Sequence, residues 1–126
     1  VILTPHQGEF QRIGGDLTKD RITAAREMAE KTGGVIVLKG YRTVVAGPDG
    51  RVYVNSTGNP GMATGGSGDV LSGILTCLVG QGMEPVQAAA AAVWIHGAAG
   101  DAAAARLGIR SMLPTDMIGA LSEILM

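Results

Sequence analysis

The chain has 126 residues, of which 46% are hydrophobic and 20 are glycine, and its formal net charge is −1. This length allows one domain with a hydrophobic core and is too short for two. The near-neutral charge gives no electrostatic reason to expect DNA, RNA or an anionic membrane as a partner, and the ordinary apolar fraction argues against a disordered or collagen-like chain.

The single cysteine bears on the expected cellular location. Cys77 cannot form a disulfide within the chain, and it lies among apolar residues at helical spacing. These features predict a reducing, cytoplasmic setting. No run of residues reaches the roughly 18 apolar residues of a membrane span, so a membrane is not an expected partner.

Two strands and a helix are predicted near the start of the chain. Residues 1–4 are mostly apolar and precede Pro5, which suits a buried strand. Residues 18–31 carry apolar and small side chains at helical spacing and precede two glycines, which predicts a surface helix. Residues 35–38 form a β-branched run typical of a parallel strand buried on both faces. Because the chain opens at Val1 in mid-pattern, we expect a fragment or a processed chain.

The rest of the chain combines a hairpin with helices. Residues 43–46 and 51–55 flank Gly-Pro-Asp-Gly, which predicts a hairpin. Helices are predicted over residues 69–79, 85–107 and 114–126, the last with Thr115 as its cap. Strands precede helices, with one βα crossover. This order indicates the α/β class, with helices flanking a mostly parallel open sheet that carries an antiparallel hairpin.

A glycine-rich loop runs directly into the helix predicted at residues 69–79. Residues 59–69 read Asn-Pro-Gly-Met-Ala-Thr-Gly-Gly-Ser-Gly-Asp. Gly65, Gly66 and Gly68 let backbone N–H groups converge, and the helix start adds donors at its positive dipole end. The loop is therefore predicted to bind an anion, although it matches neither a P-loop nor a dinucleotide fingerprint. Since it also departs from the nucleophile elbow, Ser67 is a poor nucleophile.

Asp69 has two interpretations. An aspartate at a helix start often only caps the helix, which contributes about 1 kcal/mol. Beside an anion-binding loop, an ionised carboxylate can instead take a proton from a hydroxyl while backbone amides hold a phosphoryl group. The combination favours a phosphoryl-transfer site.

Further polar residues follow the predicted strands. His6 and Glu9 come after the first strand and Lys39 after the second, at the carboxyl ends where ligands of open α/β sheets bind. We expect His6 and Glu9 to face one site as substrate contacts rather than as metal ligands, because no further His or Cys accompanies them. Asp101 lies in an Ala-rich helix whose small residues suggest tight packing, and it is a weak catalytic candidate.

Several motifs together carry a family resemblance. They are Thr-Pro-His at residues 4–6, Gly-Glu-Phe at 8–10, Lys-Gly through Thr at 39–43, the run at 59–69 continuing with Val-Leu-Ser-Gly, and His-Gly with Gly-Asp at 96–101. On these motifs the chain resembles the ribokinase-like domain of the nucleotide-dependent NAD(P)H-hydrate dehydratases. Gly-Gly-Ser-Gly-Asp alone indicates the wider ribokinase-like group, whereas Asn-Pro-Gly-Met-Ala-Thr before it is more specific.

The resemblance implies a cofactor-repair reaction. NADHX and NADPHX are hydrated forms of the reduced nicotinamide cofactors, and the family restores them through phosphorylation of the (6S)-hydrate hydroxyl followed by elimination of phosphate. The co-substrate would be ADP, with ATP as the eukaryotic counterpart, usually with Mg²⁺. The form of the motif looks bacterial and favours ADP.

The resemblance also implies roles for particular residues. Asp69 would be the catalytic base and would contact the hydrate together with His6 and Glu9. The nucleotide would be bound by residues of two segments, namely Lys39, Gly40, Tyr41, Arg42 and Thr43, and Asn59, Gly65, Gly66, Ser67 and Gly68.

Length is the main departure from the family. Family domains are roughly twice as long, so we expect residues 1–126 to be the C-terminal portion of one ribokinase-like nucleotide-binding domain, with the rest of the hydrate site before Val1, and we expect a homo-oligomer. Two alternatives are open. The protein could be a small-molecule or carbohydrate kinase of the same superfamily, or a non-catalytic half-domain that needs a partner segment or an oligomer to cover its sheet edge.

Overall fold

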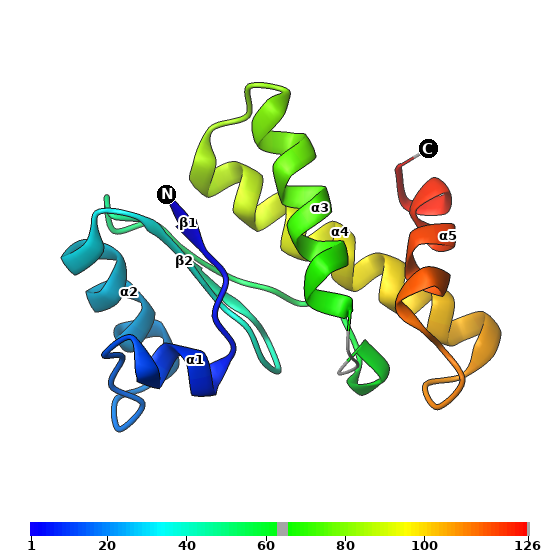
Figure 1. Ribbon diagram of the computed structural model, residues 1–126, viewed down its shortest axis with the longest axis horizontal. Coiled ribbons are helices and arrows are strands. Elements are labelled where there is room, and N and C mark those ends of the chain that lie inside the picture. Colours follow the sequence, from blue (N-terminus) through cyan, green and yellow to red (C-terminus); the bar gives the residue numbers. More distant parts are fainter. Residues whose placement is uncertain (63–65, 126) are drawn as a thin grey trace. The chain divides into compact units, whose positions relative to one another are not determined.

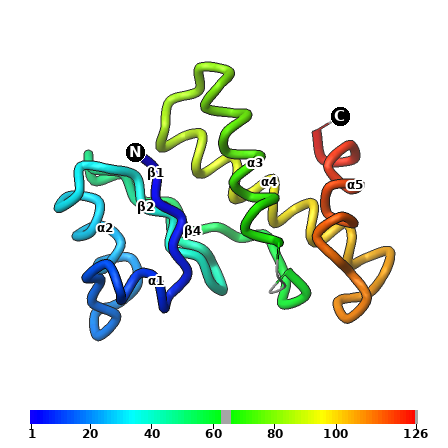
Figure 2. Tube along the Cα trace, in the orientation of Figure 1, coloured from blue at the N-terminus to red at the C-terminus, as the bar shows by residue number. Residues whose placement is uncertain are grey.

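The computed structural model describes residues 1–62 and 66–125, which divide into two compact units (Figures 1 and 2). The first unit contains Val1–Asn55 together with Glu84–Ala90, and the second contains the remaining described residues. Within the described residues, no helix is long and apolar enough to cross a membrane.

A four-stranded mixed sheet forms the centre of the first unit. Its order is β1-β2-β3-β4, with β1 (Ile2–Leu3) parallel to β2 (Val35–Leu38), and with β3 (Val44–Ala46) and β4 (Val52–Val54) joining as antiparallel neighbours. Figure 2 lets the reader follow β1 beside β2. All four residues of β2 are buried, as its β-branched run predicts. The predicted α/β class, the crossover and the hairpin are confirmed.

The helix α2 (Arg21–Thr32) covers this sheet and packs against β2 and β3. The Asp20 side chain caps it by accepting a hydrogen bond from the Thr23 N–H at 2.9 Å, and Gly33 ends it with φ 69°. Small residues on its inner face let it approach the sheet closely, and the apolar core between them contains Phe10, Met28 and Ile36.

A short helix, α1 (Gln7–Arg12), lies where the sequence predicts no element. It begins with a reciprocal cap between His6 and Glu9, and Phe10 anchors it with a fully buried ring. A six-residue helix is too short to show a periodic apolar pattern, so its signal in the sequence is the cap alone.

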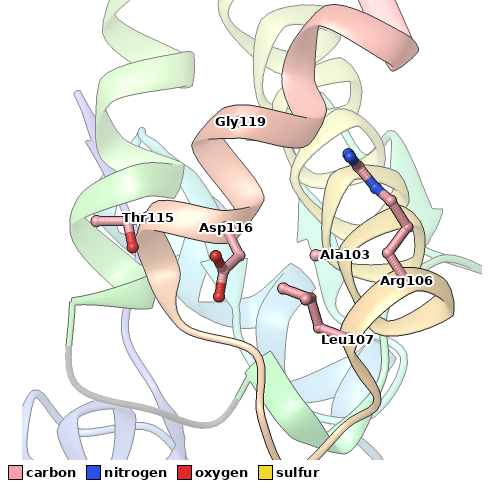
Figure 3. A pocket seen from close by; sticks show the side chains of 6 residues that line it. All are labelled: Ala103, Arg106, Leu107, Thr115, Asp116 and Gly119. Atoms are coloured by element: carbon pink, nitrogen blue, oxygen red, sulfur yellow. The ribbon is translucent and has the colours of Figure 1, made fainter.

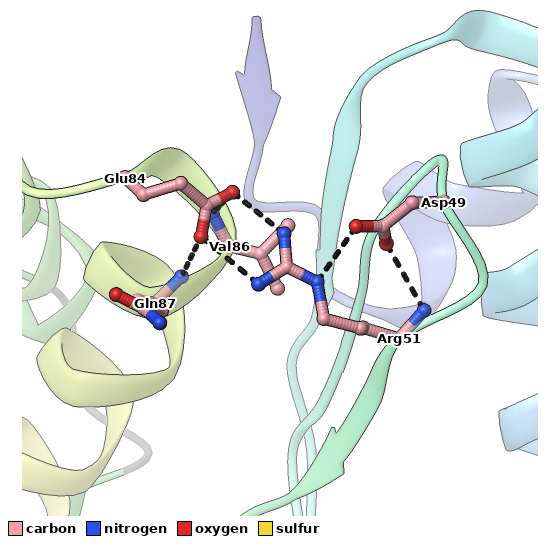
Figure 4. Close-up of polar contacts among 5 residues, drawn as sticks. All are labelled: Asp49, Arg51, Glu84, Val86 and Gln87. Atoms are coloured by element: carbon pink, nitrogen blue, oxygen red, sulfur yellow. Dashed lines mark hydrogen bonds and ion pairs between the residues drawn. The ribbon is translucent and has the colours of Figure 1, made fainter.

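The hairpin turn is joined to the start of α4 (Pro85–Leu107) inside the first unit. The Arg51 guanidinium pairs with Asp49 at 2.7 Å and with Glu84 at 2.7 Å (Figure 4). Glu84 also accepts hydrogen bonds from the Val86 and Gln87 N–H groups, so its carboxylate caps α4 while it holds the hairpin.

The second unit consists of helices: η1 (Pro60–Met62), α3 (Ser67–Gly80), most of α4, and α5 (Pro114–Leu125). α3 begins two residues before the predicted start, and α4 has the predicted bounds. Buried side chains of α4 and α5, including Ala103 and Met117, share one core with Met112. The prediction that Thr115 caps α5 is wrong. The helix begins at Pro114, and the Asp116 carboxylate accepts a hydrogen bond from the Leu113 N–H at 2.7 Å.

Candidate functional site

The carboxyl ends of the two parallel strands meet at one edge of the first unit. The Lys39 N–H donates to the Pro5 carbonyl at 2.9 Å, which continues the β1–β2 pairing past the last residues of the strands. His6 and Lys39 therefore follow neighbouring strand ends, where the sequence predicts ligand contacts.

His6 and Glu9 at this edge pair with each other. The His6 N–H donates to Glu9 Oε1 and the Glu9 N–H donates to His6 Nδ1, each at 3.1 Å, and His6 Nε2 lies 3.3 Å from Glu9 Oε1. The hydrogen bond from the His6 backbone lowers the pKa of Glu9, and the positive charges of Lys39 and Arg12 add to this effect. Both side chains are half exposed, so they can meet a ligand and also start α1.

The predicted nucleotide segment 39–43 forms a tight turn after β2. The Gly40 N–H donates to Thr43 Oγ1 at 3.4 Å, and the Thr43 hydroxyl donates back to the Gly40 carbonyl at 3.2 Å. Arg42 has φ 56°, in the left-handed region that few residues other than glycine adopt. Tyr41 is 83% exposed, and the Arg42 guanidinium lies 5.6 Å from its ring centroid. The turn thus presents an aromatic ring and a cation to solvent.

In the second unit, α4 holds the loop that carries Asn59. The Gly58 N–H and the Asn59 side-chain amide each donate to the Asp101 carboxylate at 3.0 Å. The Thr57 hydroxyl donates to the Trp94 carbonyl at 3.0 Å. The Asp101 carboxylate is thus engaged in hydrogen bonds that hold the loop, in line with its weakness as a catalytic candidate.

Two glycines of α4 allow the same loop to approach. A Cβ at Gly97 would lie 2.1 Å from Thr57 Oγ1, and a Cβ at Gly100 would lie 2.4 Å from Met62 Sδ. The small residues between 96 and 101 therefore produce the tight packing that the sequence suggests, and the partner is the 57–62 loop.

The predicted anion loop reaches α3 at Gly66, which is the N-cap with φ 93°. The Asp69 and Val70 N–H groups both donate hydrogen bonds to the Gly66 carbonyl, at 3.1 and 3.2 Å. The N–H groups of Ser67 and Gly68, in the first turn, have no acceptor within the helix and lie at its positive end. Gly65 lies outside the described residues.

The Asp69 carboxylate lies in the first turn of α3 and is exposed. The position that caps the helix belongs to Gly66, so the interpretation of Asp69 as the cap is wrong. Within residues 1–62 and 66–125, the Asp69 side chain has no hydrogen-bond partner. Its carboxylate is therefore available to a ligand at the helix start.

Two residues without an assigned role contact these segments. The hydroxyl of Ser67, which is 6% exposed, lies 3.2 Å from His96 Nε2. The Arg21 guanidinium donates to the carbonyl of Leu38, the last residue of β2, and to the carbonyls of Tyr41 and Arg42 in the turn after it. Ser67 and His96 are 29 residues apart, and Arg21 is 17 to 21 residues from its partners, so no local pattern in the sequence indicates either contact. Only His96 belongs to one of the motifs that carry the family resemblance.

A pocket of about 320 Å³ in the second unit contains none of the predicted site residues (Figure 3). It is lined by α4 and α5 through Ala103, Arg106, Leu107, Thr115, Asp116 and Gly119. Arg106 already pairs with Glu123 at 2.6 Å, and Asp116 is engaged at the start of α5. Its charged groups thus have partners within the protein.

Comparison with known proteins identifies the family. The model of the carbohydrate-kinase-type NAD(P)H-hydrate dehydratase family matches residues 1–123. A bifunctional NAD(P)H-hydrate repair enzyme of Moorella thermoacetica is 50% identical over 99% of this chain, which covers 24% of that enzyme. An ADP-dependent (S)-NAD(P)H-hydrate dehydratase of Neisseria meningitidis serogroup B is 45% identical over 90% of this chain and 40% of its own length.

Solved structures agree with this result. The ADP/ATP-dependent NAD(P)H-hydrate dehydratase of Bacillus subtilis, co-crystallised with ATP and Mg²⁺, superposes with a TM-score of 0.93 at 38% identity, over 99% of this chain and 47% of that one. A ribokinase-like superfamily protein of Enterococcus faecalis gives a TM-score of 0.87 at 36% identity, over 99% of this chain and 43% of that one. The chain thus spans less than half the length of these relatives. The fold is ribokinase-like, and the chain belongs to the NAD(P)H-hydrate dehydratase family.

Proposed function

We propose that the full-length protein dehydrates NADHX and NADPHX to NADH and NADPH with ADP, or ATP, as the phosphoryl donor. The observation that carries the proposal is the start of α3. There the exposed Asp69 carboxylate follows two N–H groups that have no acceptor within the helix. A base beside an anion-binding helix end is the arrangement that phosphoryl transfer to a hydroxyl requires.

In the first step, Asp69 accepts the proton of the hydrate hydroxyl as its oxygen attacks the terminal phosphorus of the nucleotide. The new O–P bond forms while the phosphoanhydride bond breaks, which releases AMP when ADP is the donor. The N–H groups of Ser67 and Gly68, together with the dipole of α3, stabilise the charge on the transferred phosphoryl group.

In the second step, phosphate leaves the hydrate carbon as its C–O bond breaks, and the neighbouring carbon loses a proton. The resulting double bond restores the reduced nicotinamide ring. Phosphorylation assists this step because phosphate is a far better leaving group than hydroxide.

The remaining site residues bind the substrates in this proposal. His6 and Glu9 contact the hydrate, and the lowered pKa of Glu9 favours its ionised form. Residues 39–43 contact the nucleotide, where the exposed Tyr41 ring can stack on a base and Lys39 and Arg42 can meet phosphates. Asn59 and the 65–68 segment complete the nucleotide contacts.

Magnesium would enter with the nucleotide. Among the described residues, no three His, Cys, Asp or Glu side chains lie close enough to hold a metal ion. Mg²⁺ in nucleotide sites is held by phosphate oxygens, waters and one or two carboxylates rather than by a protein cage. The residues present fit this mode, because Asp69 is an exposed carboxylate at the start of α3, where the phosphoryl group is proposed to bind. When bound, the ion would neutralise phosphate charge.

A cytoplasmic location and a homo-oligomeric state belong to the same proposal. The cysteine content supports the first, and the exposed edge strand β4, with Tyr53 41% and Val54 46% exposed, supports the second.

The test is a reaction of the full-length protein with NADHX and ADP, followed by the absorbance of the reduced nicotinamide ring. We expect recovery of NADH and release of AMP and phosphate. Asp69→Asn should lower kcat on the order of a hundredfold or more, with a smaller effect on the KM values. Asp116→Asn is the matched control, because Asp116 occupies the same first-turn position of α5 and its replacement keeps a hydrogen-bond acceptor.

Two results would contradict the proposal. A phosphorylated product that accumulates without recovery of NADH would instead indicate a small-molecule kinase. Nucleotide binding without either reaction would indicate a non-catalytic protein.

A further inference from the structure

We infer that Arg21 is the positioning residue of the nucleotide-binding turn, which it holds from the backbone side in the conformation that presents Tyr41 and Arg42. This inference rests on the proposed function, which assigns the turn to the nucleotide. Arg21 lies in the first turn of α2, well outside the segment whose geometry it sets.

The guanidinium of Arg21 spans the turn from beginning to end. Its Nη2 donates to the Leu38 carbonyl at 3.0 Å, where β2 ends. Its Nη1 donates to the Tyr41 carbonyl at 2.5 Å and to the Arg42 carbonyl at 3.2 Å. One rigid, planar group thus fixes three carbonyls separated by up to four residues, which a lysine ammonium cannot do with the same geometry.

These contacts act where the backbone is strained. The left-handed conformation of Arg42 is unfavourable for a residue with a side chain and persists only where surrounding contacts hold it. The hydrogen bond from Arg21 to the Arg42 carbonyl is such a contact. Gly40 lets the guanidinium approach, because a Cβ there would lie 2.9 Å from Arg21 Nη2. The conformation of the turn therefore depends on Arg21, Gly40 and Arg42 together.

The charge of Arg21 is not neutralised by the part of the protein that the structure describes. Its hydrogen bonds to the described residues all go to carbonyls, and it forms no ion pair with a described carboxylate. Its Nε atom is buried without a hydrogen-bond partner among the described residues. Burial lowers its pKa from the ordinary value, but a guanidinium stays protonated in proteins. A fixed positive charge without a counter-ion therefore lies behind a turn assigned to a polyphosphate.

The experiment compares Arg21→Met and Arg21→Lys with Arg26→Met in the full-length protein. Arg26 is an exposed arginine on the same helix and has no resolved partner in the turn. We expect Arg21→Met to raise the KM for ADP about tenfold, because the turn loses the three hydrogen bonds that hold it in the binding conformation, with the KM for the hydrate and kcat within about twofold. Arg21→Lys should fall between Arg21→Met and the wild type, because it keeps the charge but not the three-carbonyl contact. Arg26→Met should match the wild type.

Amide hydrogen exchange of residues 40–43 without nucleotide supplies a second readout that does not depend on activity. Arg21→Met should exchange faster there than Arg26→Met. If the wild type does not restore NADH, the proposed function fails while hydrogen exchange still decides the role of Arg21. Equal increases in both KM values, or unchanged exchange in Arg21→Met, would overturn the inference, since a merely destabilised sheet would impair both substrates alike.

Discussion

The turn after β2 and the 57–62 loop, which carries Asn59, are both proposed to contact the nucleotide, but they are held in different ways. A long side chain from α2 holds the turn, because Arg21 donates to two of its carbonyls and to the carbonyl at the end of β2. The loop is held by close approach to α4, where a Cβ at Gly97 would meet the loop backbone and Asp101 accepts two hydrogen bonds. Loss of the Arg21 guanidinium should therefore disturb the turn, whereas addition of a single methyl group to α4 should disturb the loop.

Addition of a methyl group at position 97 should have the largest effect on stability. The Cβ of Gly97→Ala would lie 2.1 Å from Thr57 Oγ1 and 2.7 Å from the Thr57 carbonyl carbon, so the backbone of the loop must move. Overpacking of this kind costs about 1–3 kcal/mol. We expect a lower urea midpoint for the full-length protein. An unchanged midpoint would mean that the loop does not pack on α4 as described.

Loss of the Asp101 carboxylate should cost about 1 kcal/mol, since it removes the acceptor of two partly exposed hydrogen bonds. Asp101→Ala should lower the midpoint less than Gly97→Ala and should raise the KM for ADP through Asn59. Asp101→Asn keeps one acceptor oxygen and serves as the comparison. Equal behaviour of the two variants would show that the acceptor is not what holds the loop.

A methyl group at a helical glycine without neighbours should have the opposite sign. Gly73 lies in the middle of α3, and a Cβ there would meet nothing within 4 Å. Gly73→Ala should therefore stabilise the protein by about 0.5–1 kcal/mol. The measurement is again the urea midpoint, and a destabilised Gly73→Ala would reveal a surface that α3 packs against in the full-length protein.

The smallest effect is expected for the exposed Arg51 pair, and it should depend on pH. Hydrogen bonds from Arg51 lower the pKa of Glu84 below its ordinary value of 4.5. A lowered pKa stabilises the folded state above that ordinary value, and this contribution is lost as the pH falls through the lowered pKa. The Tm difference between wild type and Arg51→Met should be small near neutral pH, because the pair is exposed, and should vanish in acid. Arg26→Met should show no such pH dependence.

The predictable part of the fold is the part with strong local patterns. The β-branched run over β2 and the alanine-rich run over α4 predict both elements with the observed bounds. The sequence does not predict the helix α1, because the helix has no periodic apolar pattern. One buried ring and a reciprocal cap stabilise it instead. Thr115 fails as a cap because Pro114 already takes the first helical position, which proline favours.

In the candidate site too, some features follow from local sequence patterns and others do not. Its residues could be named from motifs, since the glycines and Asp69 are contiguous at a helix start. Their contacts could not, because Arg21 and the turn are 17 to 21 residues apart, and Ser67 and His96 are 29 apart.

The two close-packed glycines of α4 differ in how freely evolution can change them. At Gly100, the three atoms nearest to a Cβ all belong to the flexible Met62 side chain, at 2.4 to 2.9 Å. Position 100 can therefore covary with position 62, with a larger residue at one matched by a smaller residue at the other. At Gly97, a Cβ would also meet the Thr57 carbonyl carbon, which no substitution at position 57 removes. One turn of helix thus separates a residue with a compensating partner from a residue that has none.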